Sequence, residues 1–320
     1  MNEARVPSRP GCAHQLLLYG DDAQFLSAAL PFAHDGVTAG EPVFVATNRH
    51  NTALLRRRLG PRAGRVTFAA AHWFRSPAQA LLSFHDKART GGPGSRVLGE
   101  APWNEFAPGQ LREWSRYESL LTLALASTGA RHLCPYNTAV LAPGILRTAR
   151  LTHPTLAAGS SHLANPDHVA PAEFSAGCDA APLSEPPMGS AEFHFAEPRQ
   201  IAALREFAAW SARCAALSSG RVDSLLICVA EAATNVLRHG GGAGACRIWA
   251  TAYELICEIS DDGGDLDTAL AGHLPPDPAR PGGRGLWLIR RLSDAADIRS
   301  TGHGTTVRIR MTLDRRRATP

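Results

Sequence analysis

Residues 231–240, EAATNVLRHG, place three polar side chains along one line of an otherwise apolar helix pattern. Glu231, Asn235 and His239 follow one another at intervals of four, and residues four apart lie on the same face of an α-helix. A carboxylate and an amide should therefore lie side by side, with an imidazole one turn later. An ordinary amphipathic helix with a polar end has the same spacing, so the surrounding segments must decide between the two interpretations.

The second half of the chain predicts an α+β sandwich around this helix. Helix patterns and strand patterns alternate in blocks, and two of the strands meet near Ala252 and Tyr253. Helices and antiparallel strands in such an order indicate helices on one face of a mixed sheet. The expected helices span 197–217, 218–240 and 284–293, and the expected strands lie within 191–198, 246–260 and 296–311.

Three later segments carry residues suited to nucleotide binding. Segment 260–265, SDDGGD, follows a strand, so the Asp261 carboxylate could accept a hydrogen bond from a purine amine. Segment 280–289, RPGGRGLWLI, puts glycines before a short helix, whose free N-terminal amides attract phosphate. Segment 302–307, GHGTTV, begins the last strand with the hydroxyl of Thr305. Each segment taken alone is more simply a turn.

In their order and spacing, the four segments resemble the N, G1, G2 and G3 boxes of the GHKL ATPase superfamily over residues 191–313. The resemblance implies a Bergerat fold that binds ATP with Mg²⁺ between a helical layer and a sheet. Asp265 stands where the G1 pattern DxGxG has its last glycine, which adds a negative charge near the nucleotide. The resemblance implies Glu231 as catalytic carboxylate, Asn235 as magnesium ligand, and nucleotide contacts from Asp261, Gly263, Gly283, Gly285 and Thr305.

Within the superfamily, the compact module is similar to the RsbW-like anti-sigma factors and serine-protein kinases. That branch implies ATP-dependent phosphorylation of a serine or threonine on a STAS-domain anti-anti-sigma partner, and sequestration of a sigma factor. A non-catalytic nucleotide-binding module that sequesters partners is the alternative, which Asp265 favours. A histidine kinase is a further alternative, but His194 lies in a strand pattern rather than in a phosphoacceptor helix.

The first half of the chain alternates strands and helices, which predicts a parallel α/β sheet. It contains no GxxxxGK[ST] segment, so no P-loop is expected. The expected strands lie within 14–20, 41–48, 95–103 and 131–137, and the expected helices within 22–40, 49–60, 76–90 and 111–128.

Residues 12–171 resemble the MEDS sensory domain, which precedes anti-sigma modules in RsbA-type regulators. The resemblance is carried by 14–47, 111–125 and 133–141, followed by THP at 152–154. It implies a small-molecule signal, and the carboxyl ends of parallel strands are the usual ligand edge of such a sheet. The candidate sensor pocket consists of residues at predicted strand ends, each of which could also be structural: His14, Tyr19, Glu100, Trp103 and Tyr136.

A metal site is not expected in this half. His14 and His132 lack a metal-binding spacing, and Cys12 near His14 has no two further ligands close in the sequence.

Composition and charge limit the remaining possibilities. The seven cysteines contain no CxxC pair, which favours reduced thiols and a cytoplasmic protein. A net charge of +4, with one short basic run at 315–317, does not predict nucleic-acid binding, and no apolar run predicts a membrane span. We expect a flexible N-terminus at 1–11, a linker at 172–190 and a tail at 314–320, and the sequence leaves a homodimer open.

Overall fold

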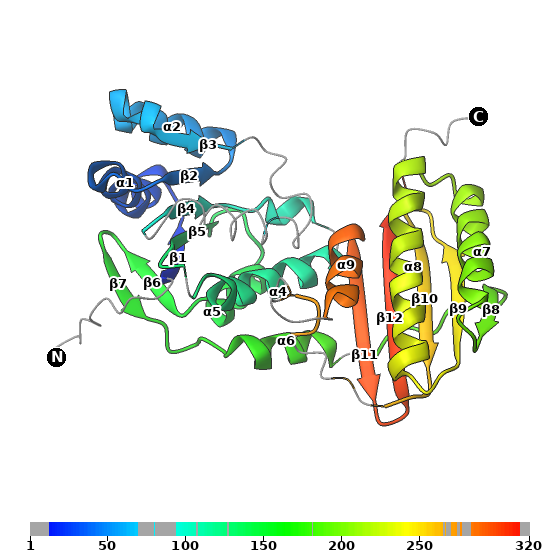
Figure 1. Ribbon diagram of the computed structural model, residues 1–320. Coiled ribbons are helices and arrows are strands. Elements are labelled where there is room, and N and C mark those ends of the chain that lie inside the picture. Colours follow the sequence, from blue (N-terminus) through cyan, green and yellow to red (C-terminus); the bar gives the residue numbers. More distant parts are fainter. Residues whose placement is uncertain are drawn as a thin grey trace. The chain divides into compact units, whose positions relative to one another are not determined.

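The computed structural model divides into two compact units, Met1–Phe174 and Ser175–Pro320, each with a sheet of its own (Figure 1). No helix in the described part of the chain is both long and apolar enough to cross a bilayer. The structure describes residues 13–69, 80, 94–106, 108–126, 128–180, 182–264, 266, 270–273, 276 and 283–313.

The N-terminal unit is built on a seven-stranded sheet with the order β3-β2-β4-β5-β1-β6-β7. All neighbouring strands are parallel except β6 and β7, which form an antiparallel hairpin at one edge. The predicted parallel α/β sheet is therefore confirmed. The strands are β1 (Ala13–Tyr19), β2 (Val43–Ala46), β3 (Val66–Phe68), β4 (Arg96–Gly99), β5 (Arg131–Asn137), β6 (Thr155–Ala158) and β7 (Ser161–Ala164).

Helices lie on both faces of this sheet, with α1 and α2 on one side and α4 and α5 on the other (Figure 1). Local signals explain where α1 begins and ends: the Asp21 side chain accepts from the Gln24 amide at 2.8 Å, and Gly40 ends the helix with a φ of 74°. The predicted helix at 76–90 lies almost wholly outside the described residues. The helices are α1 (Asp22–Ala39), α2 (Arg49–Leu59), α4 (Pro108–Leu125) and α5 (Pro143–Thr152), with short 3₁₀ turns η1 (Gly60–Arg65) and η3 (Trp103–Glu105).

The C-terminal unit has a five-stranded sheet with the order β11-β12-β10-β9-β8, and α7, α8 and α9 cover one face of it (Figure 1). The predicted two-layer arrangement is confirmed. The elements are β8 (Ala191–Phe195), α7 (Gln200–Cys214), α8 (Ser219–His239), β9 (Gly244–Ala250), β10 (Glu254–Asp261), α9 (Arg284–Leu292), β11 (Ala295–Thr301) and β12 (Gly304–Thr312).

The prediction of a mixed sheet in this unit is wrong, because every neighbouring pair is antiparallel. The topology explains the difference. The connection β10–α9–β11 is a parallel crossover, but β12 lies between these two strands and pairs with both of them. Two helices in succession, α7 and α8, connect β8 to β9, so the chain returns in the opposite direction.

Residues alternate between the two faces of this sheet. Ile259 on β10 and Val307 on β12 belong to the apolar core under the helices. Their neighbours Glu258 and Arg308 therefore lie on the other face, where the two side chains are buried and paired at 2.5 Å. The apolar residues at alternate positions of each strand thus attach the sheet to its helices.

The predicted linker at 172–190 has more structure than its composition indicated. Helix α6 (Pro171–Asp179) occupies its first half. At its end the Asp179 carboxylate accepts from Arg299 at 2.5 Å, and the Ser184 carbonyl further on accepts from Arg308 at 2.7 Å. Because side-chain hydrogen bonds rather than an apolar face attach this segment to the sheet, hydrophobic periodicity could not reveal it.

Candidate functional site

Helix α8 holds Glu231 and Asn235 side by side at the margin of its buried face. Helix α9 packs against the same place. A Cβ atom added to Gly285 would lie 2.9 Å from Glu231 Oε2 and 3.3 Å from Asn235 Nδ2. The first turn of α9 therefore lies against the two polar side chains, and a Cβ atom at position 285 would require them to shift.

The first turn of α9 has the chemistry to attract an anion. Gly283 is its N-cap residue, with a left-handed φ of 71° that favours glycine, and it has no side chain to cap the helix. The first amides of a helix carry a partial positive charge and attract phosphate oxygens. The structure thus places an anion-attracting helix end beside the carboxylate and the amide of α8.

Asp261 stands at the end of β10 with its carboxylate held in place by the backbone. Its Oδ1 atom accepts from the Gly263 amide at 2.9 Å and from the Thr305 amide at 3.3 Å. Asp261 has the same strand parity as Ile259, so it lies on the helix-facing side of the sheet. The Thr305 hydroxyl lies 3.0 Å from that of Ser300 on the neighbouring strand.

Glycines allow the end of α8 to approach this carboxylate closely. A Cβ atom at Gly240 would lie 2.5 Å from Asp261 Cγ, and one at Gly263 would lie 2.2 Å from the carbonyl carbon of Gly240. The predicted residues thus form two groups, one where α9 meets Glu231 and Asn235 and one where the end of α8 meets Asp261, and helix α8 connects the two. His239 is exposed at the end of α8, and Asp265 lies outside the described residues.

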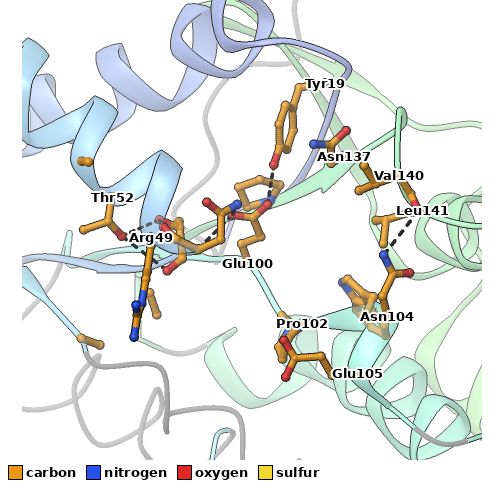
Figure 2. A pocket seen from close by; sticks show the side chains of 18 of the residues that line it. Tyr19, Arg49, Thr52, Glu100, Pro102, Asn104, Glu105, Asn137, Val140 and Leu141 are labelled. Atoms are coloured by element: carbon orange, nitrogen blue, oxygen red, sulfur yellow. Dashed lines mark hydrogen bonds between the residues drawn. The ribbon is translucent and has the colours of Figure 1, made fainter.

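A second candidate site is a cavity of about 810 Å³ at the carboxyl ends of the strands of the N-terminal sheet (Figure 2). Tyr19, Glu100 and Trp103 line it, as predicted. The Tyr19 hydroxyl donates to Glu100 Oε1 at 2.5 Å, and burial together with this carboxylate raises the pKa of Tyr19. A protonated phenol and a carboxylate thus form one wall of the cavity.

The sequence interpretation missed two asparagines at this wall. Asn51 donates to both the Tyr19 hydroxyl and Glu100 Oε2, each at 2.9 Å, and Asn48 donates to Glu100 Oε2 at 3.0 Å. Helix α2 begins where β2 ends, so its N-cap residue Asn48 and its first turn necessarily lie at the ligand edge of the sheet. The short connection between these two elements was the signal that could have revealed them.

His14 and Tyr136 do not line this cavity, so the structure brings three of the five candidate residues together here. Tyr136 is buried behind it and stacks on Trp103 with ring centroids 5.2 Å apart. His14 lies near the opposite end of β1 from Tyr19 and is fully buried. The prediction grouped both ends of the strands, whereas in a parallel sheet only the carboxyl ends form the ligand edge.

Comparison with protein families assigns both units. Residues 13–154 match the family described as MEDS, the MEthanogen/methylotroph, DcmR Sensory domain, and residues 195–311 match the histidine kinase-like ATPase domain. The chain joins a MEDS domain to a histidine kinase-like ATPase domain. No curated protein matches the chain.

The ATPase domain contains Glu231, Asn235 and the other candidate nucleotide contacts, and its family implies ATP binding, usually with Mg²⁺. The residues present fit these groups. Asn235 offers a carbonyl oxygen of the kind that Mg²⁺ accepts, Glu231 lies beside it, and Gly285 keeps the space above both free of a side chain. The MEDS domain contains the cavity at the sheet edge, consistent with a sensory role.

Proposed function

We propose that this protein is a sensory regulator whose ATPase domain is an RsbW-like serine/threonine kinase. The kinase phosphorylates a STAS-domain anti-anti-sigma partner with ATP and sequesters a sigma factor, under the control of a small molecule in the MEDS cavity. The observation that carries the proposal is the close approach of Gly285 to Glu231 and Asn235, which brings a carboxylate, an amide oxygen and the first turn of α9 together.

Each residue has a role that its position supports. Asn235 would hold Mg²⁺, which supplies positive charge to the phosphates. Glu231, one helical turn away, would orient the attacking serine hydroxyl and accept its proton. Asp261 would receive the adenine amine, since backbone amides already hold its Oδ1 atom in a fixed orientation. Phosphoryl transfer needs mainly such positioning, so no covalent enzyme intermediate is required.

Nucleotide binding is tested first, by calorimetry with ATP in the presence and absence of Mg²⁺. We expect the wild type to bind ATP in a magnesium-dependent way and Asn235→Ala to lose most of this binding. Asp223→Asn removes an exposed carboxylate about three turns before Asn235 on the same helix and should bind like the wild type. A wild type that fails to bind ATP would contradict the proposal.

Transfer is tested next, with γ-labelled ATP and a panel of STAS-domain proteins. We expect Glu231→Gln, which keeps the shape of the side chain, to retain ATP binding and to lose labelling of the partner. Labelling that survives in Glu231→Gln would refute the role of this carboxylate. Binding without transfer to any STAS protein would favour the non-catalytic module, and acid-labile phosphate on this chain would favour histidine-kinase chemistry.

A further inference from the structure

Four buried side chains of the MEDS domain meet at one point although they are far apart in the sequence. His14 comes from β1, Glu118 from α4 and Cys134 from β5, and His153 directly follows α5. Three of them are fully buried, and Glu118 is 3% exposed. One potential ligand atom from each lies within 4.8 Å of all the others.

Four of the six separations among these atoms fit the edges of a tetrahedron around a small metal ion. The Oε2 atom of Glu118 lies 3.4 Å from His14 Nε2 and 3.3 Å from His153 Nε2. Cys134 Sγ lies 3.4 Å from His14 Nε2 and 3.3 Å from Glu118 Oε2. Tetrahedral ligands at about 2.0–2.3 Å from a zinc ion are about 3.3–3.7 Å from one another.

The two imidazoles are oriented as metal-binding histidines are. His153 Nδ1 donates to the Ala149 carbonyl at 2.7 Å, which leaves the lone pair on Nε2 directed at the cluster. His14 Nδ1 lies 3.1 Å from the Thr122 hydroxyl, so its Nε2 atom also faces the other ligands. Outer partners on the second ring nitrogen fix the tautomer of a ligating histidine in this way.

The cluster has a buried acceptor that the protein itself leaves unsatisfied. His153 Nε2 is fully buried and makes no hydrogen bond within the described residues, and Glu118 Oε2, 3.3 Å away, is itself an acceptor that cannot satisfy its lone pair. A buried polar atom without a partner destabilises the folded state. A bound metal ion would satisfy this lone pair together with those of the other three ligands.

We propose that the MEDS domain binds one divalent ion of the zinc class through His14 Nε2, the Glu118 carboxylate, Cys134 Sγ and His153 Nε2. Sulfur and imidazole ligands select Zn²⁺ over Mg²⁺ and Ca²⁺, and four protein ligands without an open position are typical of a structural site. The ion joins two strands, α4 and the end of α5. Spacing along the sequence could not indicate this site, because the partners of His14 come from distant parts of the chain.

The first experiment measures metal in the full-length chain, purified without a histidine tag. We expect about one zinc per chain by mass spectrometry of the elements. After removal of the metal with a chelator, titration with Co²⁺ should give tetrahedral visible bands and a thiolate-to-cobalt charge-transfer band, saturating near one equivalent. A chain that contains no zinc and gives no thiolate band with Co²⁺ would refute the site. Magnesium at the ATPase domain gives neither signal.

Variants then identify the ligands. Cys134→Ser should lose the charge-transfer band, whereas Cys228→Ser, which alters a buried thiol of the ATPase domain, should keep it. Glu118→Gln preserves the shape of the side chain and should weaken Zn²⁺ binding by more than about 100-fold, and Thr122→Val should weaken it by about 10-fold through His14. A Cys134→Ser variant that folds and keeps the band would overturn the proposal. If Cys134→Ser does not fold, unchanged affinity in Glu118→Gln would overturn it instead.

Discussion

The two domains differ in whether their buried polar side chains find partners within the protein. In the ATPase domain, the buried charged residues Arg308 and Glu258 lie on the sheet face away from the helices and pair across strands at 2.5 Å. In the MEDS domain, His14, Glu118 and His153 converge inside the core, where a buried imidazole nitrogen stays without a hydrogen bond in the described part of the chain. The Arg308–Glu258 pair needs no further partner, whereas the MEDS cluster needs a bound ion to satisfy its lone pairs.

The kind of sheet explains the difference. Helices cover both faces of the parallel MEDS sheet, so a polar strand residue on either face is enclosed (Figure 1). Helices cover one face of the antiparallel ATPase sheet, so alternate strand positions can be polar and can pair with their neighbours across the ladder. A buried polar group without a hydrogen-bond partner therefore indicates a bound ligand more strongly than a buried polar group that already has a partner within the protein.

The largest effect should come from leaving one buried charge of the ATPase sheet alone. Arg308→Met removes the partner of Glu258, which is 5% exposed, and should lower the free energy of unfolding of this domain by about 3–5 kcal/mol. The measurement is urea unfolding, followed domain by domain through hydrogen exchange and mass spectrometry.

Two controls accompany this variant. The double variant Arg308→Met with Glu258→Leu leaves no unpaired charge and should recover most of the loss. Arg247→Met breaks a half-exposed pair with Glu192 and should change stability by less than about 1 kcal/mol. If the double variant is as unstable as Arg308→Met alone, the loss of stability does not come from an unpaired charge on Glu258. That result would contradict the contrast between the two domains.

An intermediate effect should appear on acidification of the metal-free protein. Burial lowers the pKa of His14 to about 3 and that of His132 to about 4, whereas an unfolded histidine titrates near about 6.5. Between these values the unfolded state binds more protons than the folded state, so stability is lost as the pH falls. We expect each histidine to cost the MEDS domain about 2 kcal/mol between pH 7 and about pH 5.

The ATPase domain provides the internal control for acidification. No histidine is buried among its described residues, so histidine titration should change its stability much less over the same pH range. Hydrogen exchange at both pH values measures the two domains in one sample, and His132→Gln should show a smaller pH dependence in the MEDS domain. Equal loss in the two domains would contradict the assignment of the acid sensitivity to the buried histidines.

The smallest effect should come from one methyl group at the ATPase site. Gly285→Ala puts a Cβ atom 2.9 Å from Glu231 Oε2 and should weaken ATP binding by about 10-fold, or about 1.4 kcal/mol, by calorimetry. Gly220→Ala is matched to it, because Gly220 is also the second residue of its helix and a Cβ atom there meets nothing within 4 Å. That control should leave ATP binding unchanged, and a Gly285→Ala variant that binds like the wild type would show that this contact does not shape the site.

The sequence predicted features that depend on local periodicity or on strand order. The interval of four places Glu231 beside Asn235 in any α-helix, and the position of Tyr19 and Glu100 at the carboxyl ends of strands leads to the cavity in which both are found. Periodicity could not predict α6, which lacks an apolar face, nor the antiparallel order of the second sheet, which depends on where β12 inserts.

By itself, the sequence determined two domains of different fold class and the polar line on α8, because apolar periodicity follows directly from backbone geometry. Only the tertiary structure decided that His14, Glu118, Cys134 and His153 share one point. No spacing along the chain relates these four residues. They meet because β1 pairs with both β5 and β6 and because α4 lies across the sheet, and such long-range pairing is set by the fold as a whole.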